Sequence, residues 1–160
     1  MADFFQQLQD SDFGMWVSTS PSLLAYPTIL MLHTVGLAMV VGANAVLDLR
    51  VLGAGRRIPL DALRPVFPIM AFGFVINAST GLTLFISEAA DKGTAPIFWI
   101  KLSVIAAALI VALGLRRVLF GRARRDGEHA RDAGMKGLAV LSLVLWLGAI
   151  FAGRLMAYVR

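Results

Sequence analysis

Long apolar runs alternate with short polar segments along most of the sequence. The four longest runs cover residues 23–47, 66–87, 96–119 and 137–158. Each provides the roughly 20 residues that a helix needs to cross the hydrocarbon core of a bilayer. Because the connections between the runs are short, the pattern predicts an all-α fold, an integral membrane four-helix bundle with up-down-up-down topology.

A shorter amphipathic stretch precedes the first run. Phe4, Phe5 and Leu8 share one face of a helix, with Asp and Gln residues around them. We expect residues 1–22 to form an N-terminal interfacial or capping segment with a short helix, and residues 23–160 to form the bundle. The segment is expected to cover the mouth of the bundle or to contact a partner subunit. It lacks the basic start and the cleavage site of a secretory signal peptide, so the first run is expected to direct insertion.

The composition supports a membrane protein and excludes several cofactors. Hydrophobic residues make up 58% of the chain and charged residues 16%, whereas soluble domains carry about 25% charged residues. The absence of cysteine excludes disulfides, thiolate metal sites, iron–sulfur clusters and covalently attached c-type haem. The net charge of +5 is concentrated in two loops, so nucleic acid is not an expected partner, whereas membrane lipid is.

Basic residues gather in the first and third connections between the runs. Those connections, together with the last turn of the third run, contain Arg50, Arg56, Arg57, Arg64, Arg116, Arg117, Arg122, Arg124, Arg125, Arg131 and Lys136. The second connection has only Lys92, against Glu88 and Asp91. By the positive-inside rule, both Arg-rich loops are expected to face the cytoplasm and both termini to lie outside.

One ionisable side chain, His33, lies inside the first apolar run. Such residues are costly in hydrocarbon and are candidates for function. At about 100° per residue, Asn44 and Asp48 fall close to His33 on the helix surface, so this face is expected to point into the bundle. Counted from residue 23, His33 lies about 15 Å deep, close to the middle of the membrane.

The second run presents a small, polar face that is the expected neighbour of this histidine. Its members are Gly73, Asn77, Thr80, Gly81 and Leu84. Above His33, Lys101 near the outer start of the third run and Arg154 near the outer end of the fourth place two cations in the outer leaflet. An anionic group, such as a haem propionate, would be bound well between them.

Each of these residues also has a purely structural interpretation. His33 could simply hydrogen-bond a backbone carbonyl or Asn77 across the helix interface. Lys101 and Arg154 could extend to the outer lipid headgroups. His129, in a charged loop, lies at the wrong depth to share a ligand with His33.

At the cytoplasmic edge, two further interpretations follow from charge. Asp48 is expected to form an ion pair with Arg50 or Arg64. The basic run at residues 122–125 is expected to act as a topology signal and to contact lipid phosphates.

The sequence offers no complete catalytic set, so no catalytic residue is predicted. One buried histidine does not assemble a Ser/His/Asp or Cys/His set. Metal sites bound by protein alone need three or four ligands, and His33 is the one good candidate. No phosphate-binding glycine loop is present.

Several segments together carry a resemblance to known families. They are residues 24–27, 32–37, 41–42, 47–53, 80–85, 98–102 and 153–158. Over nearly the whole chain, they resemble an uncharacterised family of bacterial four-span integral membrane proteins, which implies the fold and a bacterial inner (cytoplasmic) membrane but no activity. Relatives often carry a second histidine near the cytoplasmic end of the third span, where this sequence has Leu115, Arg116 and Arg117; this departure argues against a two-histidine haem.

More distant resemblances point to haem. The first-span histidine and the Lys101-Leu102 opening of the third span are similar to the membrane-bound, haem-containing protoporphyrinogen oxidases. The same features look somewhat like the copper-resistance D-type membrane domain. These similarities fall on the positions that the depth argument selects.

Together, these features predict a small integral membrane protein that binds b-type haem, with His33 as the iron ligand. Asn77 and Thr80 would support the site, while Lys101 and Arg154 would neutralise the propionates. The role would be electron transfer, or that of the membrane subunit of a redox complex. Two alternatives remain: a non-catalytic structural subunit of a larger membrane complex, and a quinone or lipophilic small-molecule binding protein.

The second axial position of the iron is not assigned by the sequence. It would be empty, held by Met70 or Met156, or shared across a homo-oligomer.

Overall fold

The structure is a computed structural model that describes residues 2–55, 57–120, 128–156 and 158, and of residues 128–132 only the backbone. In chain order, the helices are α1 (Ala2–Gln9), α2 (Asp12–Thr19), α3 (Tyr26–Leu52), the 3₁₀ helix η1 (Leu60–Leu63), α4 (Val66–Ser87), α5 (Ala89–Thr94), α6 (Pro96–Phe120) and α7 (Glu128–Leu155). Within the described residues there is no strand, which confirms the predicted all-α fold.

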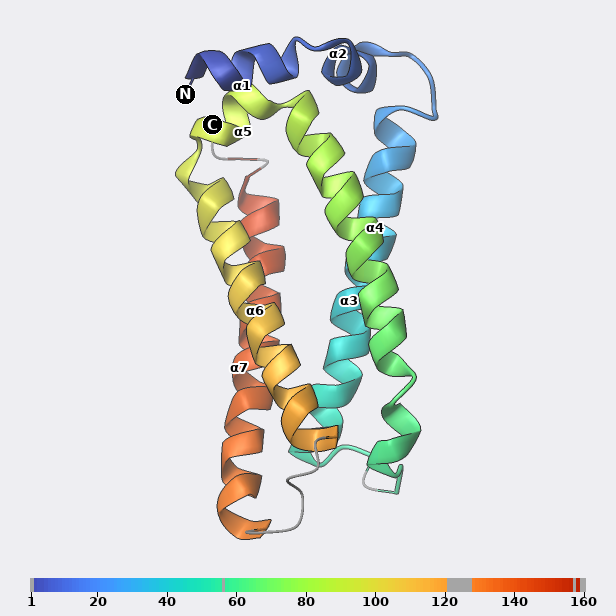
Figure 1. Cartoon of the computed structure of the whole chain (residues 1–160), viewed down its shortest axis with the longest axis vertical. Coiled ribbons are helices and arrows are strands. Elements are labelled where there is room, and N and C mark those ends of the chain that lie inside the picture. The colour runs from blue at the N-terminus through green and yellow to red at the C-terminus, as the bar shows by residue number, and fades with distance from the viewer. Residues whose placement is uncertain (1, 56, 121–127, 157, 159–160) are drawn as a thin grey trace.

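Four long helices, α3, α4, α6 and α7, form the body of the molecule (Figure 1) and run alternately away from and toward the end that carries α1. Helix α3 packs against α4 and α7, and α6 packs against α7. All four are long and apolar enough to cross a membrane. The predicted up-down-up-down bundle is therefore confirmed, with the composition of a membrane protein.

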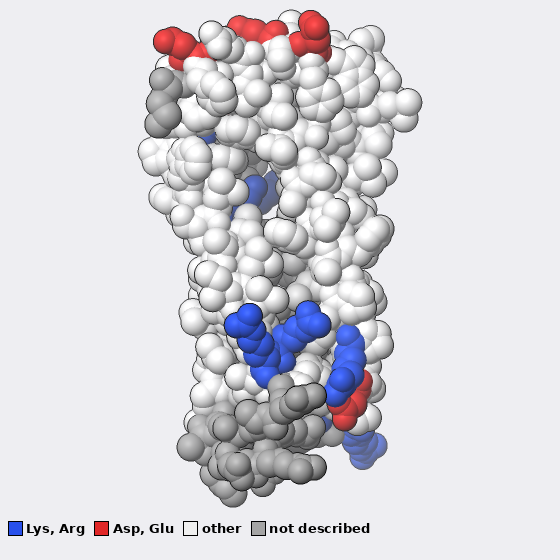
Figure 2. Space-filling view, viewed as in Figure 1, with Lys and Arg blue, Asp and Glu red and all other residues white. Residues whose placement is uncertain are grey.

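Charge is segregated along the long axis of the bundle. Figure 2 shows acidic side chains at the end covered by α1 and α2, and most of the basic side chains on this face near the opposite end. The acidic end carries Asp3, Asp10, Asp12, Glu88 and Asp91, and the Arg-rich end carries Arg50, Arg57, Arg64, Arg116, Arg117 and Lys136. The white zone between them has the composition expected of a lipid-facing belt.

Helix α3 is shifted along the chain relative to the predicted run of residues 23–47. Residues 23–25 form a turn, in which the Ser22 hydroxyl accepts a hydrogen bond from the backbone N–H of Leu24 at 3.2 Å. Pro27 then occupies the first turn of the helix, where its missing N–H costs nothing. The helix ends at Gly53, whose φ of 111° is in the left-handed region and suits glycine because it has no Cβ.

The other long helices differ in how well they follow the predicted runs. Helix α4 covers residues 66–87 as predicted, and α6 extends one residue beyond the predicted range of 96–119. Helix α7 begins earlier than the predicted residue 137, because the polar turns after residue 128 are also helical, and it ends at Leu155, before the predicted residue 158. The number of apolar residues does not predict polar helical turns that extend a helix beyond its apolar part.

The N-terminal segment folds as two short helices where the sequence indicates one. Ser11 separates them, because its hydroxyl accepts from the backbone N–H of Gly14 at 3.2 Å and caps α2. Helix α1 packs on α5, a short helix in the connection that the apolar pattern treats as a loop. The ring of Phe5 lies against Gly93, and the Gln9 side chain accepts from the backbone N–H of Ala90 at 3.0 Å.

Helices α3 and α4 approach each other closely through two glycines. A Cβ on Gly36 would lie 2.7 Å from the backbone nitrogen of Asn77, and one on Gly73 would lie 2.6 Å from the Cβ of Met39. Small residues at such crossings let helix backbones come together in a membrane. This contact brings the polar face of α4 within hydrogen-bonding distance of His33.

Candidate functional site

His33 and Asn77 are joined by reciprocal hydrogen bonds across the α3–α4 interface. The Nδ1 of His33 lies 3.0 Å from the backbone carbonyl of Asn77, and the Asn77 side-chain amide donates to the backbone carbonyl of His33 at 2.8 Å. Since a carbonyl oxygen can only accept, the first contact places the proton on Nδ1. This contact alone is what a structural histidine would make.

Thr80 completes the environment of Nδ1. Its hydroxyl donates to the backbone carbonyl of Ile76 at 2.6 Å, and its oxygen lies 3.2 Å from His33 Nδ1. The hydroxyl can therefore accept a second, longer hydrogen bond from the imidazole. Both bonds to Nδ1 come from α4, and together they fix the plane of the ring.

The Nε2 atom of His33 is left with its lone pair. The Asn77 side-chain amide nitrogen, which donates to the His33 carbonyl, also lies 3.4 Å from Nε2 and 3.2 Å from Nδ1, so its second N–H is available to the Nε2 lone pair. A neutral imidazole with Nδ1–H bonded to a backbone carbonyl is the arrangement in which Nε2 serves as a metal ligand or accepts a hydrogen bond. The chemistry available to this site is therefore that of an oriented, neutral nitrogen base.

Gly81 makes room for the ring. A Cβ at this position would lie 3.0 Å from Cε1 and 3.4 Å from Nδ1 of His33. The imidazole is partly exposed, so one side of it is not covered by protein. His33 lies seven residues into α3, about 10 Å along the helix, which places it in the half nearer the acidic end and not at the middle as the sequence suggests.

Lys101 faces the same interior region, while Arg154 does not reach it. The Lys101 ammonium lies against Gly153 of α7, where a Cβ would be 3.6 Å from its Nζ. Arg154, the next residue after Gly153, is exposed, and no described contact joins it to His33.

A hollow opens into this half of the bundle. Figure 2 shows basic side chains set back inside it, behind the white surface. The described cations of this half are Lys92, Lys101 and Arg154. Of these, Lys92 is paired with Glu88 at 2.8 Å and Arg154 is exposed, so Lys101 is the partly buried cation without an acidic partner within the part of the chain that the structure describes.

Asn44 and Asp48 do point into the bundle, but they meet α7 and not α4. Asn44 is 2% exposed and Asp48 0%. The Asn44 amide donates to the Asp48 carboxylate and to the hydroxyl of Ser142, the latter at 2.7 Å. Sequence reasoning missed Ser142, because one serine in an apolar run gives no signal of its own.

The expected ion pair between Asp48 and Arg50 or Arg64 is not formed, which corrects the sequence-based expectation. Arg64 pairs with Asp61 at 3.1 Å, and the Nε of Arg50 donates to the backbone carbonyl of Ile58 at 2.8 Å. Asp48 is buried one turn before the helix end, on the side of α3 that faces α7. The arginines lie beyond the helix end or on its other side, so they find nearer partners.

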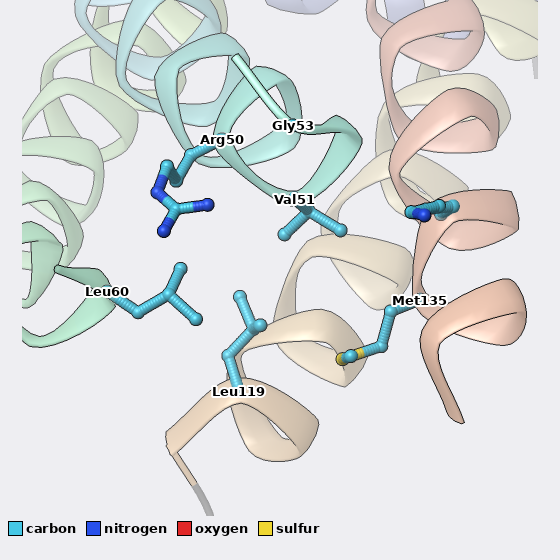
Figure 3. A pocket seen from close by; sticks show the side chains of 7 residues that line it. Arg50, Val51, Gly53, Leu60, Leu119 and Met135 are labelled. Atoms are coloured by element: carbon cyan, nitrogen blue, oxygen red, sulfur yellow. The ribbon is translucent and has the colours of Figure 1, made fainter. Parts of the chain in front are cut away.

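The Arg-rich end contains a cavity of about 450 Å³. In Figure 3, side chains from the end of α3, from η1, α6 and α7 surround it. Its lining residues are Arg50, Val51, Gly53, Leu60, Leu119, Met135 and Lys136. The sequence singled out Arg50 and Lys136 only for their charge and predicted no cavity, since the cavity exists only where four separated segments meet.

Some sequence-based expectations fall elsewhere. Met70 is buried in the apolar core with Phe67 and Leu47, toward the Arg-rich end, so it is not a neighbour of His33. Residues 122–125 and the side chain of His129 lie outside the described residues. No group of three or more His, Cys, Asp or Glu side chains that could hold a metal ion occurs in the described ranges.

The fold and the site together define a four-helix membrane-type protein with a polar site in one half of its bundle. Comparison of the chain with protein-family models, with curated proteins and with solved structures finds no match. The argument for function therefore starts from the geometry of His33.

Proposed function

We propose that the protein binds b-type haem through His33 and serves electron transfer, alone or as the membrane subunit of a redox complex. The observation that carries the proposal is the hydrogen bond of 3.0 Å between His33 Nδ1 and the Asn77 carbonyl. It holds the imidazole in one tautomer and orientation, with the lone pair on Nε2. Iron would replace the long contact of 3.4 Å between the Asn77 amide nitrogen and Nε2. Haem-ligating histidines owe their orientation to hydrogen bonds of this kind.

The residues present fit one axial ligand and a cationic neighbour. Asn77 and Thr80 orient the ring, Gly81 leaves space beside it, and Lys101 offers a positive charge to a propionate. Arg154, at the acidic end of α7, would serve the second propionate only by turning its flexible side chain inward. Bound haem would supply one-electron chemistry, and the chain would exclude water from it and set its electrostatic surroundings.

The second axial position would be empty, held by Met156, or shared across a homo-oligomer. Met156 lies at the acidic end of the bundle, just after α7, and is partly buried. Met70 is excluded from this role by its place in the apolar core.

The test is an absorption spectrum of the full chain, purified in detergent from cells supplied with a haem precursor. A Soret band with about one haem per chain by pyridine haemochrome is expected, and His33→Ala should abolish it while eluting as the same folded species. His129→Ala is the matched control and should retain haem. Absence of a Soret band in the native chain, or full retention in His33→Ala, would contradict the proposal.

A second candidate is a quinone or another lipophilic small molecule at the same site. It is favoured by the partly buried Lys101, whose ammonium can donate to a quinone carbonyl, and by Nε2 of His33, which can accept from the hydroxyl of a quinol. Organic extraction of the purified protein followed by mass spectrometry distinguishes the two occupants. A quinone present in the native chain and absent from His33→Ala, with no Soret band in either, would favour this alternative.

A structural subunit of a larger membrane complex is the third interpretation. Helix α1 packs on α5 of its own bundle, so the N-terminal segment caps the acidic end and leaves less of its apolar face for a partner. If the segment still holds a partner, deletion of residues 2–18 should release that partner on native electrophoresis while the bundle remains folded. A single monomeric species in both forms would remove support for this role.

The charge pattern supports a location in a bacterial inner membrane. With the Arg-rich end in the cytoplasm, as the positive-inside rule requires, the His33 site lies in the outer half of the bilayer. An electron partner would then approach from the side of α1 and α2.

A further inference from the structure

Two arginines and two phenylalanines alternate at the Arg-rich end, where Arg64 after η1 and Phe67 at the start of α4 meet Arg116 and Phe120 at the end of α6. The Arg116 guanidinium lies 4.9 Å from the centre of the Phe67 ring, and the Arg64 guanidinium lies 5.2 Å from the centre of the Phe120 ring. The two rings meet edge to face with centroids 5.3 Å apart. We call these four residues the Arg–Phe cluster.

The rings hold the two guanidinium groups in place by cation–π contact. Such contact uses the face of a guanidinium and leaves the N–H groups at its edge free to donate. Phe67 is itself buried, with 6% exposure, so it is a fixed platform for Arg116. The arrangement restricts two normally flexible side chains at one position on the bundle surface.

Arg116 lacks an acceptor for these N–H groups. Within the described part of the chain, no hydrogen bond or ion pair joins it to another residue. Arg64 is partly satisfied, since it pairs with Asp61 at 3.1 Å. Arg116 lies four residues before the end of α6, about 6 Å inside the helix, where lipid tails provide no acceptors.

We propose that the Arg–Phe cluster binds the phosphate of an anionic phospholipid in the leaflet at the Arg-rich end. A phosphate presents several acceptor oxygens in the geometry that a guanidinium edge matches. Two arginines at the bilayer boundary favour a headgroup with net negative charge. The exposed apolar side chain of Leu113 on α6 lies about one turn nearer the centre than Arg116, where an acyl chain would pack.

The source of the phosphate follows from this position. A free anion would have to leave water for a site at the membrane boundary, whereas a phospholipid already holds its phosphate there, within reach of the long side chain of Arg116. The proposal is independent of any occupant at His33, because the Arg–Phe cluster lies at the opposite end of the bundle.

The test uses the full chain in detergent with added phosphatidylglycerol or phosphatidylcholine, followed by native mass spectrometry. Phosphatidylglycerol is expected to bind at least about tenfold more tightly than phosphatidylcholine. Arg116→Gln should weaken binding of phosphatidylglycerol about tenfold. Arg117→Gln is the matched control, because Arg117 is exposed, carries the same charge and points about 100° away around the helix; its affinity should stay within about twofold.

Phe67→Leu tests whether lipid binding depends on the position of the Arg116 guanidinium as well as on its charge. It keeps both arginines and removes the ring beneath Arg116, so weaker lipid binding with unchanged net charge is expected. If this variant unfolds, Arg116→Lys replaces it, since a lysine keeps the charge without the planar donor edge and should also weaken binding.

Three results would overturn the proposal. Equal losses in Arg116→Gln and Arg117→Gln would mean that only diffuse charge attracts lipid. Equal binding of phosphatidylglycerol and phosphatidylcholine would remove the role of the anionic headgroup. Displacement of the lipid by millimolar inorganic phosphate would show a site for a free anion.

Discussion

His33 and Asn77 bind each other twice, once through the imidazole and once through the amide, each to the other's backbone carbonyl. The pair therefore fastens α3 to α4 and orients the imidazole in the same geometry. A histidine that only stabilised the helix interface would need the hydrogen bonds between α3 and α4, but not a defined orientation of Nε2. The orientation is what makes Nε2 a candidate ligand.

Removing the Asn77 side chain should weaken the interface and leave the imidazole partly oriented. Asn77→Ala loses the amide bond to the His33 carbonyl but keeps its own backbone carbonyl, so a cost of about 0.6–1.7 kcal/mol is expected. Unfolding of the detergent-solubilised protein by added SDS measures it. Ser79→Ala on the exposed side of α4 is the control and should change stability little; equal effects would contradict a special role of the pair.

The glycine contact between α3 and α4 should be intolerant of a single methyl group. Gly36→Ala places a Cβ against the backbone of Asn77 and Gly73, which cannot move without separating the helices, so a loss of about 1–3 kcal/mol is expected. Gly114→Ala, on α6, meets nothing within 4 Å and should be neutral or stabilising by up to about 1 kcal/mol. A destabilised Gly114→Ala alongside a neutral Gly36→Ala would refute the packing described.

The buried bonds among Asn44, Asp48 and Ser142 should make Asn44 the costliest of the polar residues to remove. Asn44→Ala removes the amide that donates to both the carboxylate and the hydroxyl, at a cost of about 1–3 kcal/mol. Ser142→Ala removes one bond and should cost less. Because the two residues share a bond, the double variant should be less destabilised than the sum of the single variants; strict additivity would argue against the bond.

The docking of α1 on α5 should depend on Gly93. A Cβ there would lie 2.6 Å from the Phe5 ring, so Gly93→Ala should displace α1 without unfolding the bundle. Limited proteolysis would then cleave near α1 several-fold faster than in the native chain. Gly134→Ala, which meets nothing within 4 Å, should cleave at the native rate.

The orientation can be tested directly because the native chain has no cysteine. A membrane-impermeant maleimide added to spheroplasts should label Asp3→Cys at once and Arg57→Cys only after lysis. The native chain gives the background signal. Labelling of Arg57→Cys in intact spheroplasts would mean that the Arg-rich end faces outward.

Local features of the sequence were enough to find the four long helices and the polar side of α4. Apolar length marks a span whatever its neighbours are, and the helical period alone brings Asn77, Thr80 and Gly81 to one face. The arginines near the ends of α3 and α6 could also be identified from the sequence, because they flank the apolar runs. These features depend on residues close together in the chain.

What the sequence alone could not decide was which neighbour each face would meet. His33 and Asn44 lie near each other on the surface of α3, yet His33 contacts α4 and Asn44 contacts Ser142 on α7. A helix that packs against two others contacts both with neighbouring residues of one face. Which residue meets which helix depends on where the backbones cross. The Gly36–Gly73 contact sets that crossing, as the Phe67–Phe120 contact sets the place of Arg116, and both arise only from packing between distant segments.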